Sequence, residues 1–367
     1  MSVLTNQYQG AKVLVTGHTG FKGTWLCLWL IQLGAKVSGI SLDIPSEPSL
    51  FLSSNLKNKI QDYRLDIRDG EKLKKLIHKI QPDYVFHLAA QSLVRASYEN
   101  PIDTISTNAM GSVHILDALR ILEKEVAAVM ITSDKAYDNV EWIWGYRETD
   151  RLGGKDPYSA SKGMAELAIR SYVESFLNST NSKVTVGIAR AGNVIGGGDR
   201  ALDRIVPDCI RAWSKKESVN IRSPDSTRPW QHVLEPLSGY LLLGSLLAKR
   251  KISNGEAFNF GPPAHQNFSV RTLINEMSII WDNVNWTDTS EINTSLHEAA
   301  LLKLNCDKAL SDLNWTSNLN FEETVRMTIE WYKAFYEGDE GLMYDFTISQ
   351  INEYSEIAQL RNLSWTS

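Results

Sequence analysis

Short apolar runs alternate with amphipathic stretches along the first half of the chain. The runs are rich in β-branched residues and are bounded by glycine or polar residues, which predicts buried strands. They lie at 12–16, 36–42, 63–65, 84–88, 127–132 and 184–189. Apolar positions at helical spacing predict helices between them, one through Trp25, Leu28 and Leu33 and others at 71–80, 112–122 and 158–176. Strands that alternate with helices predict an α/β fold with a doubly wound parallel sheet.

The pattern changes after Arg190. Three glycines and an aspartate at 196–199 predict a flexible joint, and turn-rich sequence continues through Pro224 and Pro229. Further helices are predicted at 204–213, 233–249, 270–281 and 322–336. We therefore expect a first domain of residues 1–190 and a smaller, interleaved α/β domain of residues 191–367, with some segments of the second returning to the first.

The composition is typical of a soluble enzyme. The 367 residues are 43% hydrophobic and 22% charged, enough for one large core or two adjoining ones. A net charge of −5 argues against binding to nucleic acid. The first residues contain no apolar block of the signal-peptide kind, and the longest apolar stretch, 240–248, is too short to span a bilayer. We expect a cytoplasmic protein that does not bind membranes.

Cysteine and histidine usage adds two expectations. The three cysteines, Cys27, Cys209 and Cys306, are far apart and lie in apolar surroundings, so we expect buried thiols in a reducing compartment. The seven histidines follow no metal-ligand spacing, so we expect no metal held by the protein.

A glycine-rich turn follows the first predicted strand directly. Gly17 permits a tight turn, Gly20 lets backbone N–H groups approach a diphosphate, and Gly23 lets the next helix press against the strand. Thr19 and Phe21, at the start of that helix, belong to the same expected cofactor site. An ordinary glycine-rich turn would show the same spacing, but the surrounding strand and helix favour a Rossmann-type cradle for a dinucleotide.

An acidic residue ends the second predicted strand. Asp43 can accept hydrogen bonds from the adenosine ribose hydroxyls and would repel a 2′-phosphate, which favours NAD over NADP. The alternative is that Asp43 only begins a polar loop before Pro45. Other cofactor contacts are expected where later strands end, because ligands of open α/β sheets bind at that edge. These residues are Asp66, Ile67, Leu88, Ala89 and Ala90.

Tyr158 and Lys162 are four residues apart on a predicted helix and therefore share a face. A neighbouring ammonium favours the phenolate, so we expect a lowered pKa for Tyr158 and a role as general base on a hydroxyl. An exposed Tyr and Lys on an ordinary amphipathic helix would be the alternative. It is disfavoured because Ser133, at the end of an apolar strand, offers a second hydroxyl for the same substrate oxygen.

The glycine turn, the His-Leu-Ala-Ala strand end, the strand-end serine and the Tyr-x-x-x-Lys pair occur in an order that resembles the extended short-chain dehydrogenase/reductase family. The resemblance covers nearly the whole chain. Within this family, four more specific stretches resemble the CDP-D-glucose 4,6-dehydratases: 17–23, 133–135, 142–148 and 228–232. The resemblance implies that NAD is held and recycled while CDP-D-glucose becomes CDP-4-dehydro-6-deoxy-D-glucose, an early step toward the 3,6-dideoxyhexoses of bacterial surface polysaccharide (O antigen).

The implied reaction assigns roles to a few residues. Oxidation at C4 must precede removal of the C5 hydrogen, with Tyr158 as base and Ser133 and Lys162 assisting. Asp134 is the candidate acid for loss of the C6 hydroxyl. In the related dTDP-glucose dehydratases, the next position resembles a glutamate that serves as the base, whereas this chain has Lys135 there. Lys135 either takes the C5 proton as a neutral amine or stays charged and stabilises the enolate; a regular strand would let only one of Asp134 and Lys135 reach the sugar.

The resemblance further places substrate contacts at Asn193, Arg204 and Arg228, where an amide and two guanidinium groups suit a nucleotide diphosphate. Trp142 and Trp144, together with Tyr146, form a lid, a core contact or a subunit contact.

Family membership implies a homodimer through a four-helix interface, formed by the helices near Ser112 and Met164, and leaves a homotetramer open. Two other functions stay open: a nucleotide-sugar 4-epimerase, which would need no Asp134 acid, and a non-enzymatic NAD-sensing protein, which would need no intact Tyr158–Lys162 pair.

Overall fold

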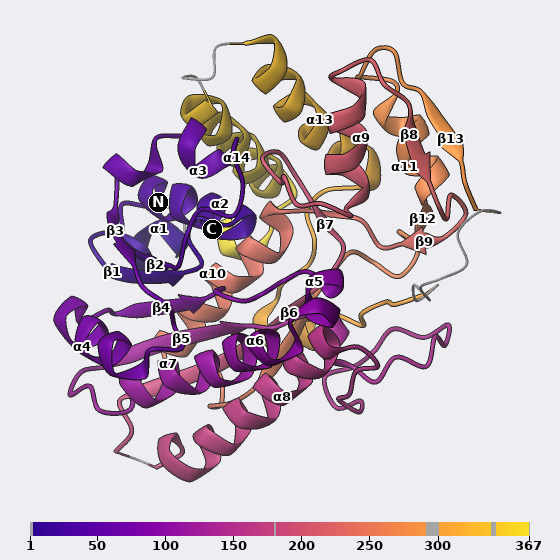
Figure 1. Cartoon of the computed structure of the whole chain (residues 1–367). Helices are drawn as coiled ribbons and strands as arrows, with labels where there is room; N and C mark the ends of the chain where they lie inside the picture. The colour runs from indigo at the N-terminus through magenta and orange to yellow at the C-terminus, as the bar shows by residue number, and fades with distance from the viewer. Residues whose placement is uncertain (1–2, 180, 291–300, 339–342, 367) are drawn as a thin grey trace.

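One parallel sheet of seven strands organises the molecule, in the order β11-β6-β5-β4-β1-β2-β3 (Figure 1). The computed structural model describes residues 3–179, 181–290, 301–338 and 343–366. The sheet strands are β1 (Lys12–Thr16), β2 (Lys36–Ser41), β3 (Gln61–Arg64), β4 (Tyr84–His87), β5 (Val126–Ile131), β6 (Val184–Ala191) and β11 (Ala257–Phe260). The predicted fold class and all six predicted strands are confirmed.

The strands that follow β1 in the chain are added first on one side of it and then on the other. This strand pairs with β2 on one side and with β4 on the other, and Thr16 lies opposite Ile40 and His87. Open α/β sheets bind ligands outside the carboxyl ends of their strands, where two neighbouring connections leave in opposite directions. The glycine turn after β1 and the segments after β4 and β5 therefore meet at this point.

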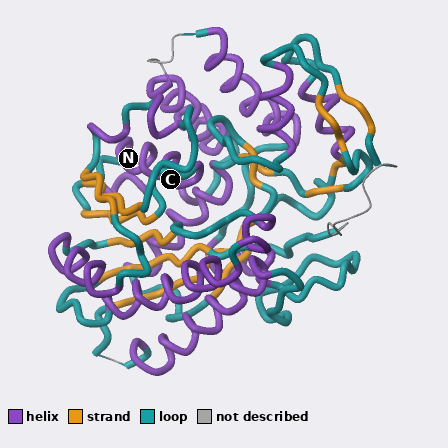
Figure 2. Tube along the Cα trace, in the orientation of Figure 1, coloured by secondary structure: helices purple, strands orange, loops and turns teal. Residues whose placement is uncertain are grey.

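Helices cover both faces of the sheet, because side chains alternate along each strand. Val13 and Val15 face a core with α2 and α10, whereas Leu14 faces a second core with α4, α7 and α8. Figure 2 shows the sheet enclosed between these helical layers. The helices of the two layers are α1 (Val3–Tyr8), α2 (Phe21–Gln32), α4 (Gly70–Ile80), α7 (Gly111–Leu119), α8 (Pro157–Tyr172), α10 (Leu234–Ala248) and α14 (Met343–Leu360).

A smaller region stands over the carboxyl ends of the strands. It contains three two-stranded pairs, β10–β7, β12–β9 and β13–β8. Its strands are β7 (Val194–Ile195), β8 (Val219–Ile221), β9 (Thr227–Arg228), β10 (Gln231–His232), β12 (Phe268–Ser269) and β13 (Trp286–Asp288). Its helices are α9 (Ile205–Trp213), α11 (Val270–Met277) and α13 (Phe321–Glu337). Short helices α3 (Leu50–Ser53), α5 (Val94–Glu99), α6 (Pro101–Ile105) and α12 (Asp307–Leu313) fill connections.

The glycine run at 196–199 is a tightly packed crossing rather than the flexible joint that we predicted. Gly197 is buried, and a Cβ there would lie 1.9 Å from the Trp331 ring. The indole of Trp25 donates a hydrogen bond to the Gly197 carbonyl at 2.8 Å. The prediction was wrong because glycine here serves close approach of backbone to aromatic rings, and not freedom of the main chain.

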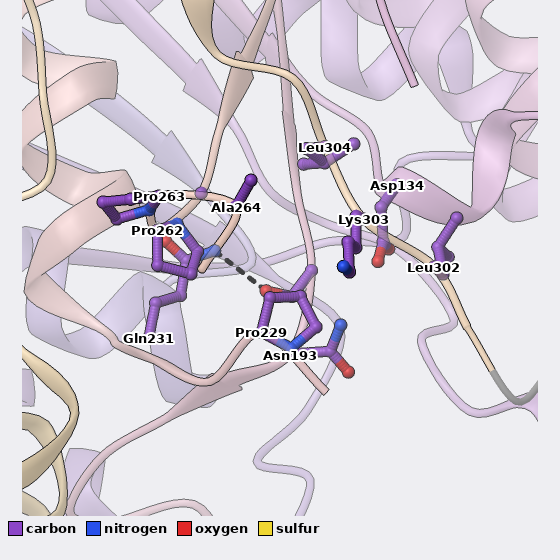
Figure 3. A pocket seen from close by; sticks show the side chains of 12 residues that line it. Asp134, Asn193, Pro229, Gln231, Pro262, Pro263, Ala264, Leu302, Lys303 and Leu304 are labelled. Carbon is purple, nitrogen blue, oxygen red and sulfur yellow. Dashed lines mark hydrogen bonds between the residues drawn. The ribbon is translucent and has the colours of Figure 1, made fainter. Parts of the chain in front are cut away.

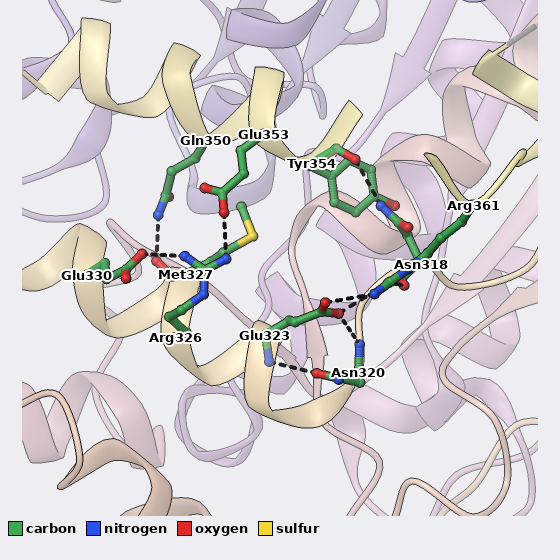
Figure 4. Close-up of polar contacts among 10 residues, drawn as sticks. All are labelled: Asn318, Asn320, Glu323, Arg326, Met327, Glu330, Gln350, Glu353, Tyr354 and Arg361. Atoms are coloured by element: carbon green, nitrogen blue, oxygen red, sulfur yellow. Dashed lines mark hydrogen bonds and ion pairs between the residues drawn. The ribbon is translucent and has the colours of Figure 1, made fainter. Parts of the chain in front are cut away.

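Later parts of the chain contribute elements to the region of the large sheet. Strand β11 adds to the sheet beside β6, and α14 packs against α2. Charged side chains join α13 to α14 and to the residue that follows it (Figure 4): Arg326 pairs with Glu353, and Arg361 pairs with Glu323 at 2.7 Å. The division into domains at residue 190 stays a prediction.

Two cysteine predictions are confirmed and one is partly so: Cys27 and Cys209 are fully buried free thiols, and Cys306 is partly buried. Within the described ranges, no helix is long and apolar enough to cross a membrane. The same ranges contain no group of three or more metal-ligating side chains in a position to hold an ion.

Candidate active site

The glycine turn after β1 forms a close-packed cradle. Gly17 has a φ of +75°, and a Cβ on it would lie 2.8 Å from the Ala89 nitrogen. A Cβ on Gly23 would lie 2.1 Å from the Gly17 carbonyl oxygen. Gly20, the N-cap of α2, has no side chain that could cap the first N–H groups of the helix. Uncapped N–H groups at a helix N-terminus suit a diphosphate.

Thr19 of the glycine turn and Asp43, the residue expected at the adenosine ribose, lie together. The Thr19 hydroxyl donates a hydrogen bond of 2.6 Å to the backbone oxygen of Asp43, whose side chain is exposed. Asp43 therefore lies beside the cradle with an exposed carboxylate, and its contact with the adenosine ribose stays a prediction.

The remaining predicted cofactor residues line the same edge in two groups. Leu88 and Ala89 donate backbone hydrogen bonds to Thr16, so they and Ala90 run alongside the glycine turn. Asp66 is held by Arg68, which lowers the pKa of its carboxyl. The Ile67 side chain is buried against Gly111.

Ser133, Asp134 and Tyr158 meet at the end of β5. The Ser133 hydroxyl donates a hydrogen bond of 2.9 Å to the Asp134 carboxylate and also interacts with the Tyr158 phenol. All three side chains are buried, with exposed fractions of 6%, 5% and 8%. Helix α8 carries Tyr158 in its first turn and is started by Asp156, which accepts a hydrogen bond from the Ser159 N–H.

The electrostatics of Tyr158 differ from the sequence-based expectation. Burial raises its pKa to about 12, although Ser133 and Arg204 act in the opposite direction. The predicted lowering of the phenol pKa is therefore wrong for this pocket, since desolvation of the phenolate outweighs the surrounding charges. Lys162 is itself buried, which lowers its pKa to about 8.

Two buried networks fix the helix that presents Tyr158 and Lys162. Asn108 donates to the Ser161 hydroxyl at 2.8 Å and ties α8 to the neighbouring helix. Glu166 forms an ion pair with Arg190, and both side chains are fully buried. Their remaining hydrogen bonds, to Thr132 among others, satisfy both charges. Neither network is predicted by a local sequence motif, because the members of each come from separate elements.

Asp134 and Lys135 differ in their surroundings. The chain leaves the strand after Ser133 and forms a 3-10 turn over Asp134–Ala136, so the alternation of a regular strand does not apply. Asp134 is buried, whereas Lys135 is exposed and its backbone N–H donates to the Ser133 hydroxyl.

A cavity opens beside Asp134 (Figure 3). It encloses roughly 320 Å³, including its mouth toward solvent. Its walls come from the end of β5, from the segments after β6 and β11, from the stretch between β9 and β10, and from residues 302–304. The lining residues are Asp134, Gly192, Asn193, Pro229, Gln231, Gly261, Pro262, Pro263, Ala264, Leu302, Lys303 and Leu304.

Of the three predicted substrate residues, one lines the cavity and two do not. Asn193 lines the cavity with a φ of +52°. Arg204 is bound to Asp199 at 2.8 Å, which raises its pKa, and it lies within electrostatic reach of Tyr158. Arg228 precedes Pro229 of the cavity wall, and its guanidinium donates to the Thr227 carbonyl.

Two lysines of the site were not predicted. Lys22, inside the glycine motif, is partly buried, and burial and the nearby Arg204 lower its pKa to about 8. A charged residue in the first turn of the helix was the available signal. Lys303 lines the cavity, but no local motif marks it.

The aromatic loop divides between core and surface. Tyr146 is buried and stacks on Tyr137 with ring centroids 5.0 Å apart. Trp142 leans on Tyr146 and is 41% exposed, and Trp144 is 55% exposed. The predicted core contact is thus confirmed for Tyr146, whereas the roles of Trp142 and Trp144 stay predictions.

Comparisons with known proteins agree with this geometry. The family model described as GDP-mannose 4,6 dehydratase matches residues 14–328. A CDP-glucose 4,6-dehydratase of Salmonella typhimurium is 47% identical over 342 residues, covering 92% of this chain and 95% of the relative. A UDP-glucose 4-epimerase of Mycoplasma pneumoniae is 24% identical over 89% of this chain and 98% of its own length.

Solved structures show the same fold. An epimerase from Methanothermobacter thermautotrophicus superposes with a TM-score of 0.77 at 23% identity, covering 91% of this chain and 95% of its own. A dTDP-glucose 4,6-dehydratase from Bacillus anthracis, in complex with NAD, superposes with a TM-score of 0.71 at 19% identity, covering 89% and 97%. The chain therefore belongs to the GDP-mannose 4,6 dehydratase family, within the extended short-chain dehydrogenases/reductases.

Proposed function

We propose that this protein is an NAD-dependent CDP-glucose 4,6-dehydratase that forms CDP-4-dehydro-6-deoxy-D-glucose and water. The observation that carries the proposal is the Asp134 carboxyl, held by Ser133 next to Tyr158 and facing a cavity. A 4-epimerase needs the tyrosine but no such acid. The relative that is 47% identical over nearly the whole chain supports the same assignment.

The residues after β1 fit a dinucleotide. The close approach of Gly17 to Ala89 and the uncapped start of α2 leave backbone N–H groups for a diphosphate, with Asp43 near the ribose position. We assign Gly17, Thr19, Gly20, Phe21 and Gly23 to the diphosphate. Asp66, Ile67, Leu88, Ala89 and Ala90 would line the rest of the cofactor. The chemistry that NAD supplies when bound is hydride acceptance from C4 and hydride return to C6.

Tyr158 is the proposed base for the O4 proton. A phenol with a pKa of about 12 holds its proton at neutral pH, so the neighbouring cations must favour the phenolate once the substrate is seated. Ser133 positions the same oxygen through its hydroxyl. Lys162, whose own pKa is lowered to about 8 by burial, is the proposed source of the positive charge when it is protonated.

Asp134 is the proposed acid of the dehydration step. The C4 ketone makes the C5 hydrogen acidic; a base removes that proton while Asp134 gives a proton to O6, so that one water leaves and a C5–C6 double bond forms. The return of hydride to C6 and of a proton to C5 completes the product. We keep Lys135 as the proposed base or enolate stabiliser, since it is exposed and directly follows Asp134, which lines the cavity.

The nucleotide-sugar contacts follow from the cavity. Asn193 lines it together with Asp134 and is the proposed partner of sugar hydroxyls. Arg204 and Arg228 are the proposed diphosphate partners, Arg204 through the part of its guanidinium not bound to Asp199. These assignments place the substrate mainly against the second region and the cofactor against the first, as the two-domain prediction states.

We also propose a homodimer through α7 and α8. Met164 and Leu167 on α8 are 46% and 60% exposed, and Met110, just before α7, is 47% exposed. Apolar side chains grouped on neighbouring helices suit a four-helix interface. Light scattering coupled to gel filtration would give twice the chain mass of 41.3 kDa, or four times that mass for a tetramer. A cytoplasmic location and a role in dideoxyhexose synthesis stay predictions that follow from the same function.

The direct test is turnover of defined substrates. The purified protein is incubated with CDP-, dTDP-, UDP- and GDP-glucose, with and without added NAD, and each reaction is followed by mass spectrometry and proton NMR. Loss of one water and a new C6 methyl signal from CDP-glucose alone is the expected result. An unchanged mass with inverted C4 would mean an epimerase, and no reaction with any substrate would refute the enzymatic function.

A further inference from the structure

Lys303 extends into the wall of the cavity beside Asp134 and Asn193 (Figure 3). The twelve residues that line this cavity include two with charged side chains, Asp134 and Lys303. The opposite wall is formed largely by proline and alanine, which offer no charge. A cation that faces a cavity lined largely by apolar residues needs an anionic group nearby, because burial without a partner is costly.

The backbone around Lys303 is fixed in place by the aromatic loop. The Tyr146 N–H donates to the Lys303 carbonyl, and the Asn305 N–H donates to the Tyr146 carbonyl, both at 2.9 Å. The two chains come so close that a Cβ on Gly145 would lie 2.7 Å from the Asn305 nitrogen. Leu302, next to Lys303, is buried with Tyr137 and Tyr146. The lysine therefore projects from a rigid segment.

The ammonium of Lys303 has no counter-ion within the described part of the chain. Neither an ion pair within 4.0 Å nor a hydrogen bond joins it to a described residue, Asp134 included. By contrast, the guanidinium of Arg204 is bound to Asp199. The ammonium of Lys303 is thus a positive charge in the cavity wall that is available to bind an anionic group of a ligand.

The expected position of the sugar predicts which group of the substrate contacts Lys303. C4, C5 and C6 of the glucose must reach Tyr158, Ser133 and Asp134. C1, which carries the nucleoside diphosphate, lies across the ring from C4, so the phosphate next to the sugar leaves the catalytic groups through the cavity. We propose that Lys303 binds this sugar-linked phosphate and so helps to seat the substrate. The inference rests on the proposed function and adds a diphosphate contact to it.

Binding measurements on nucleotides without sugar isolate this contact from catalysis. Cytidine, CMP and CDP are titrated calorimetrically into the wild type, Lys303→Met, Lys303→Arg and a control, Lys251→Met, which changes an exposed lysine after α10. We expect Lys303→Met to weaken CDP about 10- to 100-fold, as for a lost hydrogen bond to a charged group, and to leave cytidine unchanged. Lys303→Arg should retain much of the CDP affinity, and Lys251→Met all of it. Circular dichroism checks that each variant is folded.

Turnover supplies the second readout. Lys303→Met should raise KM for CDP-glucose by the same factor as the Kd for CDP, with kcat nearly unchanged. Unchanged CDP affinity in a folded Lys303→Met protein would overturn the proposal. If CDP affinity is unchanged and exchange of the C5 hydrogen with solvent is lost, Lys303 is the base instead. A wild type that binds CDP through Lys303 but does not dehydrate CDP-glucose would refute the proposed function alone, whereas a wild type that binds no CDP would refute both.

Discussion

Gly192→Ala is the most informative single change that the site offers. A Cβ on Gly192 would lie 1.9 Å from Oδ2 of Asp134, and the glycine is not in the left-handed region of φ, so alanine fits the backbone. The methyl group must therefore displace the Asp134 carboxyl, which is the softer neighbour. The variant moves the proposed acid without removing it.

The size of the effect follows from the required movement. Ordinary contact begins at 3.4 Å, so the carboxyl has to shift by about 1.5 Å, away from Ser133 or from the cavity. A misplacement of about 1 Å costs on the order of 10²-fold in rate, or about 2.7 kcal/mol of transition-state stabilisation. We expect kcat for dehydration to fall by roughly that factor. NAD affinity should change little, because the cradle after β1 is not touched.

The assay combines three measurements on CDP-glucose. Water loss is followed by mass spectrometry, the C4-oxidised state by absorbance of the reduced nicotinamide at single turnover, and thermal stability by calorimetry. Gly261→Ala is the matched control, since Gly261 lines the same cavity but a Cβ there meets Cys306 at an ordinary 3.6 Å. It should cost less than about threefold, as expected for a change that shifts no catalytic group.

A double-mutant cycle decides whether the loss passes through Asp134. In an Asp134→Asn background the side chain has the same size but gives no proton, so Gly192→Ala should then cost little further activity. A full additional loss in that background would refute the reasoning. So would a drop in NAD affinity, or a fall in stability large enough to account for the lost rate.

Three other predictions follow from buried charges. Burial raises the pKa of Glu235 to about 7, above its unfolded value, so folding stability falls as the pH rises through this range. Between pH 4.5 and 8 the wild type should lose roughly 3 kcal/mol of stability relative to Glu235→Gln, measured by urea unfolding. A difference in stability between the two proteins that stays constant with pH would contradict this. Glu166→Ala leaves Arg190 buried without its partner and should cost about 3–5 kcal/mol by the same method, while a double change to Glu166→Leu and Arg190→Met should cost less; equal losses would contradict the pairing. Lys22 lies in the first turn of α2, beside the proposed dinucleotide cradle, so Lys22→Met should weaken NAD about 10- to 100-fold by calorimetric titration while Lys22→Arg retains most of the affinity; unchanged binding would contradict a contact between Lys22 and NAD.

Local patterns predicted those parts of the molecule whose causes are local. The six predicted strands and the helix that carries Tyr158 and Lys162 follow from apolar periodicity, and the cradle follows from glycine spacing. The glycines at 196–199 suggest a loose joint in the sequence, but in the structure they are packed against Trp25 and Trp331. No local pattern predicted β11 and α14, which complete the sheet and cover α2.

The sequence by itself determined the fold class and the order of the sheet's first six strands along the chain, because each strand is marked by an apolar run of a few neighbouring residues. It also predicted Ser133, Asp134 and Tyr158 as site residues, and these three side chains lie together at the end of β5. The tertiary structure alone decided the pKa of Tyr158, the buried Glu166–Arg190 pair and the entry of Lys303 into the cavity. Desolvation and ion pairing depend on which distant segments meet, and spacing along the chain does not encode that. The direction of a pKa or the partner of a lysine therefore appears only once the chain is folded.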